Sequence, residues 1–145
     1  MFKDYYRRRF ADLTGVPLTE ADGLGDEAVV RALAQHGLEV PRALADYYSV
    51  AGRHPINRQH NRLYPIAELE WRDDRLVFLE ENQRVAFWRL PRTEVGRADP
   101  VVWQAPNAGP LEWVPEGYRL SQFLMAMWRW QLDGVEEDAA PGTSS

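Results

Sequence analysis

The sequence contains no cysteine, which excludes disulfide bonds and metal sites built on thiolates. It also has only three histidines, and none has a histidine partner at the i, i+4 spacing with which a helix binds zinc. His36 lies at the end of an expected helix, whereas His54 and His60 lie in a polar segment. We therefore expect no metal site and no cofactor.

A long hydrophobic run is also missing. No stretch approaches the roughly 18 apolar residues of a membrane-spanning helix. The N-terminal segment MFKDYYRRRF mixes charges with aromatic residues and has no apolar core of a signal peptide. The sequence therefore predicts a soluble, cytoplasmic protein that does not act on a membrane.

Positive charge is in the minority, with 17 Lys and Arg against 22 Asp and Glu and a formal net charge of −5. This balance argues against direct nucleic-acid binding, because phosphate contacts favour basic surfaces. It is compatible with a basic protein partner, since opposite potentials steer association. Apolar residues make up 45% and aromatic residues 12% of the 145 residues, which is enough for the core of one domain.

Apolar residues recur at helical spacing near both ends of the chain. The pattern predicts helices over residues 2–14, about 27–36, 41–51 and 120–132. Glycines follow the first three, and Asp26 and Ser121 are expected to cap the second and the last. In the first helix, Arg7, Arg8 and Arg9 fit a solvated face better than a basic patch for an acidic partner. The side chains expected to face the core are Val29, Val30, Leu33, Leu44, Tyr47, Tyr48, Phe123, Leu124, Met127 and Trp128.

Between these helices the pattern changes to short runs rich in β-branched and aromatic residues, separated by charged residues, proline or glycine. Residues 76–80 and 84–90 are close enough to form a hairpin. We expect an α+β fold in which residues 63–114 form a mainly antiparallel, curved sheet and the terminal helices pack on it. The domain is expected to span residues 1–133, and the acidic, then small and polar segment 134–145 is expected to be disordered.

The segment VFLEENQRVAFWRL contains the strongest acid/base candidates, Glu80 and Glu81. Such a pair can be an acid/base site, a metal cradle, a partner-binding edge or a solvated turn. Adjacent strand residues point to opposite faces, so these two carboxylates diverge unless a bulge intervenes. Glycoside hydrolysis needs two carboxyl groups that converge, and the chain has no GxSxG nucleophile motif. We predict a non-catalytic protein, with a hydrolytic enzyme using Glu80 and Glu81 as the alternative.

The densest acidic stretch in the expected domain is ELEWRDDR, which precedes this hairpin closely in sequence. We expect its carboxylates and those of the hairpin to form one negative rim for a partner, with a tryptophan as apolar anchor. The alternative is that they are strand-end charges that blunt the sheet edge. The predicted partner-binding residues are Glu68, Glu70, Trp71, Asp73, Asp74, Glu80 and Glu81.

Four segments in order resemble a known family. EVPRALADYYSVAG is similar to its opening helix, and LVFLEENQRVAFWRL is similar to its central hairpin, in which an E-N-Q triplet precedes a strand carrying Trp. ADPVVWQA resembles its DPPV strand, and LSQFLMAMWRWQ its closing helix. Together they cover residues 38–132. The family is the SUKH superfamily of bacterial toxin-immunity proteins, which includes a fungal cell-wall synthesis regulator.

The resemblance implies an α+β fold with a curved sheet and flanking helices, and protein binding without catalysis. It implies that the chain neutralises a cognate secreted toxin, often a nuclease in this family. The other function that it implies is an intracellular scaffold or regulatory module without a toxin, as in the fungal branch. The chain departs from the family in reading DPVV for DPPV. We expect a monomer or a weak homodimer.

Overall fold

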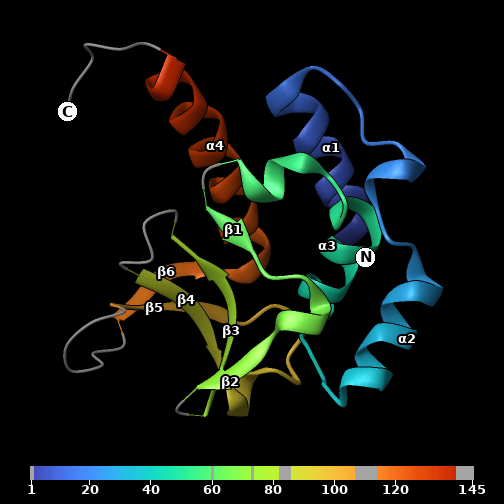
Figure 1. Cartoon of the computed structure of the whole chain (residues 1–145), viewed down its shortest axis with the longest axis vertical. Coiled ribbons are helices and arrows are strands. Elements are labelled where there is room, and N and C mark those ends of the chain that lie inside the picture. The colour runs from blue at the N-terminus through green and yellow to red at the C-terminus, as the bar shows by residue number, and fades with distance from the viewer. Residues whose placement is uncertain (1, 60, 73, 82–85, 107–113, 140–145) are drawn as a thin grey trace.

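The structure, a computed structural model, describes residues 2–59, 61–72, 74–81, 86–106 and 114–139. Its α-helices are α1 (Phe2–Thr14), α2 (Asp26–His36), α3 (Arg42–Ala51) and α4 (Leu120–Ala139). Its strands are β1 (Arg62–Leu63), β2 (Glu70–Arg72), β3 (Arg75–Glu80), β4 (Ala86–Pro91), β5 (Val101–Pro106) and β6 (Val114–Arg119). Helices at both chain ends flank a block of strands, so the predicted α+β class is confirmed (Figure 1).

All strand pairs in the described residues are antiparallel, in the order β1-β3-β4-β5-β6, and β2 pairs with the first half of β3. The register shifts between Val77 and Leu79 in β3 and between Val101 and Trp103 in β5. Such bulges increase local twist and bend a strand, and the sheet curls accordingly. The predicted hairpin of β3 and β4 is confirmed. Its turn residues 82–85 lie outside the described residues, and so do residues 107–113 of the region expected to form the sheet.

Helix α4 packs on the curled sheet through the face that its sequence predicts. Phe123, Leu124, Met127 and Trp128 are fully buried. The Phe123 ring lies edge-on to that of Phe78 in β3, with centroids 5.9 Å apart. The prediction that the last helix covers the sheet is therefore confirmed.

The interior face of α2 is narrower than predicted. Val29 is buried and Leu33 is partly buried against the core, but Val30 is 68% exposed. The helix lies at the edge of the helical layer (Figure 1), so that only one narrow stripe of its surface is covered. The predicted N-cap is also wrong, because Gly25, with φ 84°, precedes the first helical residue, Asp26.

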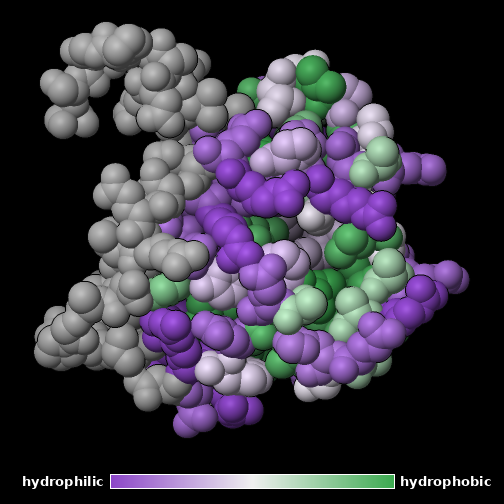
Figure 2. Space-filling view, in the orientation of Figure 1, coloured by the Kyte–Doolittle hydropathy of each residue, from purple (hydrophilic) through white to green (hydrophobic). Residues whose placement is uncertain are grey.

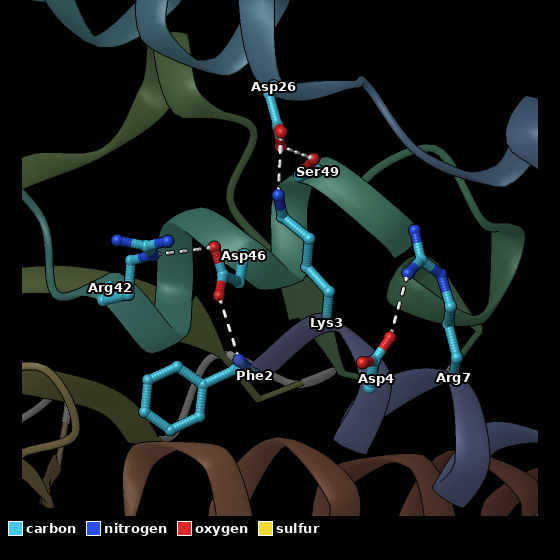
Figure 3. A network of polar contacts seen from close by, with 8 residues as sticks. All are labelled: Phe2, Lys3, Asp4, Arg7, Asp26, Arg42, Asp46 and Ser49. Carbon is cyan, nitrogen blue, oxygen red and sulfur yellow. Dashed lines mark hydrogen bonds and ion pairs between the residues drawn. The ribbon is translucent and has the colours of Figure 1, made fainter.

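The Asp26 carboxylate joins three helices instead of capping one (Figure 3). It accepts hydrogen bonds from the Lys3 ammonium on α1 at 2.7 Å and the Ser49 hydroxyl on α3 at 2.5 Å. These bonds lower the pKa of Asp26 below its usual value. Nearby, buried Asp46 of α3 accepts the backbone N–H of Phe2 at 3.1 Å. Side-chain carboxylates thus hold the start of α1 against α2 and α3.

Helix α4 begins one residue before the predicted cap and ends later than predicted. Ser121 is its second residue, and the capping oxygens belong to Asp99, which accepts the Ser121 N–H at 2.8 Å and its hydroxyl at 2.6 Å. A side chain distant in sequence therefore supplies the cap. At the other end the helix continues to Ala139, beyond the predicted end at residue 132, and the disorder of the tail stays a prediction. Residues 140–145 lie outside the described residues.

Buried polar contacts fix the polar segment between α3 and β1. The Gln131 amide nitrogen on α4 donates to the carbonyls of Ile56 and Asn61 at 2.6 and 2.7 Å, and its oxygen accepts the Asn61 N–H at 2.6 Å. The indole N–H of Trp128 donates to the Tyr47 hydroxyl at 2.7 Å. The segment therefore obtains its backbone partners from the helices, as buried polar groups require.

Candidate partner-binding surface

The structure divides the predicted partner-binding residues between the two sides of β2. Glu68 ends the 3₁₀ helix η3 (Ile66–Glu68), and Glu70 and Trp71 lie in β2. Asp74 follows in the turn to β3, and Glu80 ends β3. Successive residues of a strand face opposite sides, so the adjacent Glu70 and Trp71 diverge. Asp73 lies outside the described residues.

Glu68, Glu70 and Glu80 come together in one groove of about 600 Å³, which we call the β2 groove. It lies among η3, the end of α2 and strands β1 to β4. Its lining residues are His36, Arg62, Tyr64, Ala67, Glu68, Leu69, Glu70, Arg72, Glu80 and Phe87. Trp71, Asp74 and Glu81 do not line it.

Arg62 organises one end of the β2 groove. Its guanidinium group lies over the Tyr64 ring, 5.1 Å from the centroid. It forms an ion pair with Glu68 and a longer contact of 3.5 Å with Glu80. The aromatic ring and the two carboxylates together hold the cation in place.

Arg72 repeats this arrangement further along β2. Its guanidinium group lies 4.8 Å from the centroid of the buried Phe87 ring and pairs with Glu70 at 3.2 Å. Glu70 and Arg72 are two residues apart, so they share one face of the strand. Phe87 comes from β4, and the cluster therefore bridges two strands.

A third cluster of the same composition lies on the other side of β2. Arg92 stacks on the Trp71 ring at 3.9 Å from its centroid and pairs with Asp74 at 3.3 Å. Trp71 is partly buried against the core. Arg92 therefore covers one face of the tryptophan that was expected to anchor the rim, and the role of Trp71 in partner binding stays a prediction.

Arginines therefore alternate with the carboxylates of the predicted negative rim. In two of the clusters a carboxylate side chain is more exposed than its arginine: 52% against 36% for Glu68 and Arg62, and 85% against 54% for Asp74 and Arg92. Glu70 and Arg72 are about equally exposed. An aromatic ring covers one face of each guanidinium group. The clusters of Arg62 and Arg92 therefore present a carboxylate to solvent, although the formal charges nearly cancel.

Glu80 is not part of an exposed rim, because it is only 7% exposed. It accepts a hydrogen bond from the Tyr64 hydroxyl at 3.1 Å. Burial, assisted by the Glu80 charge, raises the pKa of Tyr64 to about 12, so the phenol stays protonated and donates. Glu80 therefore supports the floor of the groove.

Sequence reasoning missed the cationic and aromatic members of the groove. In the sequence, Tyr64 and Phe87 look like ordinary residues of the sheet region. Arg62 and Arg72 belong to no motif that indicates a binding site. His36 was expected only as a helix end, yet its Nε2 donates to the Leu69 carbonyl at 3.0 Å. The one usable signal is the alternation of arginine with acidic residues from Glu68 to Arg75.

A second cavity of about 460 Å³ lies where α1, α2 and α3 meet. Its polar groups include Lys3, Asp26 and Ser49, and these bond to one another (Figure 3). Among the described residues no group of three or more His, Asp or Glu side chains is placed to hold a metal ion. Within the same part of the chain, no helix combines the length and apolar character needed to cross a membrane.

Figure 2 shows strongly hydrophilic side chains gathered over the β2 end of the sheet, whereas apolar residues on this face form separate patches among polar ones. The β2 groove and the third cluster supply charged groups to that end. A charged surface that contains covered aromatic rings is therefore the chemically distinctive feature of this part of the molecule.

Comparisons of the chain with models of known protein families, with curated proteins and with solved structures find no match.

Proposed function

We propose that this protein is a non-catalytic binding domain that neutralises a cognate protein toxin by direct contact through the β2 groove. The resemblance of four sequence segments to the SUKH superfamily supports this function, and so does the surface chemistry around β2. The toxin would present a basic cleft, of the kind with which nucleases bind phosphate. The inhibitor would occupy that cleft with carboxylates.

The observation that carries the proposal is the repeated cluster of arginine, aromatic ring and carboxylate. Arg62 and Arg72 lie against rings inside the groove, and each pairs with a solvent-accessible carboxylate, that of Glu68 or Glu70. Ordering long charged side chains at an interface costs about 0.5–1.5 kcal/mol each. Clusters that are already ordered in the free protein reduce that cost, which favours binding over a merely solvated surface.

The groove chemistry fits binding better than hydrolysis. Glu80 accepts from Tyr64 and contacts Arg62, and Glu68 and Glu70 each pair with an arginine. Glycoside hydrolysis instead needs two carboxyl groups that face each other across the scissile bond. Glu81, the second predicted acid, lies outside the groove lining. These contacts favour a structural role for Glu80.

The first test looks for a toxin gene beside this one and expresses the toxin domain found there in bacteria, with and without this protein. Rescue of growth by the wild type is the expected result. Association of the purified pair is then measured by stopped-flow fluorescence at low and high salt. Glu68→Gln with Glu70→Gln should slow association by about tenfold at low salt and much less at high salt, because screening removes steering.

A matched control neutralises two exposed carboxylates elsewhere, Asp12→Asn on α1 and Glu27→Gln on α2. It should associate nearly as fast as the wild type. Positions 73 and 74 suit this test less well, because Asp74 has φ 59° and accepts the Arg92 N–H through its carbonyl. Equal association rates for wild type and the Glu68/Glu70 variant would place the interface elsewhere, and failure to rescue growth would refute neutralisation itself.

A further inference from the structure

A groove of about 430 Å³ lies between α1 and α4 and shares no lining residue with the β2 groove. We call it the α1–α4 groove. Tyr118 at its edge is 45% exposed, which is unusual for a large hydrophobic side chain in this structure. Tyrosine, methionine and arginine are enriched at protein interfaces. The lining residues that matter here are Tyr5, Arg9, Leu13, Tyr118, Met125 and Arg129.

The two arginines of this groove differ from those of the β2 groove. Arg9 and Arg129 are exposed, and in the part of the chain that the structure describes neither forms an ion pair or a hydrogen bond. Arg62 and Arg72, by contrast, each pair with a carboxylate. The α1–α4 groove thus combines apolar and aromatic side chains with two exposed cations, so its complement is an acidic amphipathic segment.

The chain contains a segment of that chemistry at the end of α4. Residues 132–139 read LDGVEEDA, with four carboxylates in eight positions. Leu132, Val135 and Ala139 recur at i, i+3 and i+7, the spacing of one helical face. This segment is helical, and Figure 1 shows the end of α4 projecting away from the sheet. Its sequence is that of an acidic amphipathic helix end, and along α4 it follows the residues that line the groove.

The acidic end cannot enter the groove of its own molecule. Arg129 and Met125 lie on the same continuous helix, and each further residue adds about 1.5 Å along the axis. The segment therefore points away from the groove that α4 itself lines, and folding back would break the helix. The complementary end must come from another molecule.

We propose that the protein forms a symmetric dimer in which the acidic end of α4 of each copy lies in the α1–α4 groove of the other. Because each copy contributes one groove and one helix end, the two contacts are identical and the assembly closes at two copies. Arg9 and Arg129 would face carboxylates of the partner copy, while Tyr5 and Tyr118 would cover its apolar stripe. This inference does not rest on the proposed function, and the dimer would leave two β2 grooves for other partners.

The test is sedimentation velocity of the full chain across the micromolar concentration range. The groove variant is Arg9→Glu with Arg129→Glu, and the end variant is Glu136→Lys with Glu137→Lys. Each alone should weaken dimerisation by about tenfold or more, because like charges then face each other. Mixing the two variants should restore a dimer, because both contacts in the mixed pair again join opposite charges.

The matched control reverses two exposed arginines elsewhere, Arg31→Glu and Arg58→Glu, and should dimerise like the wild type. Circular dichroism verifies folding. If the groove variant fails to fold, the end variant still tests the contact, because its substitutions lie in the projecting end of α4. A wild type that stays monomeric at the highest concentration overturns the proposal. So does a dimer that neither variant weakens, or two weakened variants that do not associate when mixed.

Discussion

His54 is the side chain whose protonation bears most directly on local structure. Its ring lies edge-on to that of Phe10, with centroids 4.8 Å apart, and its Nδ1 accepts the Ile56 N–H at 3.0 Å. Burial lowers the pKa of His54 below 6.5, although the negative charge of Asp22 acts to raise it. The folded protein therefore favours the neutral ring, which alone can accept that hydrogen bond.

This arrangement predicts a pH-dependent loss of stability. The unfolded chain binds a proton at His54 near its usual pKa, about 6.5, before the folded protein does, so stability falls as pH drops below that value. The loss stops growing below the folded pKa. His54→Asn retains an acceptor but does not titrate, and its melting temperature should fall less than that of the wild type between about pH 7.5 and 5.5.

The exposed His36 supplies the comparison variant, His36→Asn, which removes another histidine. Melting is followed by circular dichroism at each pH. Identical slopes for wild type and His54→Asn would show that His54 does not contribute to the acid sensitivity.

At the scale of elements, the docking of the segment before α2 onto α3 depends on one glycine. The N–H groups of Leu24 and Gly25 donate to the carbonyls of Tyr48 and Ser49 at 3.0 Å, which satisfies the exposed end of α3. Gly23 lies so close to this turn that an added Cβ would be 2.0 Å from the Ser49 carbonyl oxygen. The obstacle is backbone and cannot move aside cheaply.

Gly23→Ala should therefore destabilise the protein by about 1–3 kcal/mol or more, as overpacking does. Gly96→Ala is the control, because a Cβ there meets only the flexible end of Glu39 at 3.3 Å. Urea unfolding measures both free energies of unfolding. Equal stabilities of the two variants would mean that the segment does not dock on α3 in this way.

At the scale of the whole molecule, one core joins the helices to the sheet. Phe123 of α4 lies against Phe78 of β3 and against Trp88 of β4, 5.7 Å from its centroid. Tyr47 of α3 and Trp128 of α4 extend the same core toward α1. We therefore expect helices and sheet to unfold together, as the predicted single domain implies.

Phe123→Ala should lower the free energy of unfolding by about 3–5 kcal/mol, a large part of the 5–15 kcal/mol typical of a domain. Val30→Ala, at the exposed valine of α2, should change it by less than about 0.5 kcal/mol. Far-ultraviolet circular dichroism reports the helices and tryptophan fluorescence reports the core. Separate midpoints for the two probes would indicate two folding units.

The sequence by itself determined the elements whose periodicity reports burial. The helix over residues 2–14, the stripe of Leu44, Tyr47 and Tyr48, and the hairpin of β3 and β4 follow from local patterns, because a repeating apolar position needs one covering surface. The α+β order follows from the same patterns. The predictions from sequence are wrong where the tertiary structure determines a residue's environment. Asp99, which is distant in sequence, caps α4, and Val30 faces solvent instead of the core.

Only the tertiary structure decided the candidate site. The acidic stretch was visible in the sequence, but the separation of Glu70 from Trp71 depends on which face of β2 meets the core. The contact of Arg72 with Phe87 depends on strand register, which places β2 and β4 on the two edges of β3. The composition shows that charged residues are present, whereas the tertiary fold determines which charged groups contact which aromatic rings. Contacts between residues distant in sequence therefore arise only from the fold.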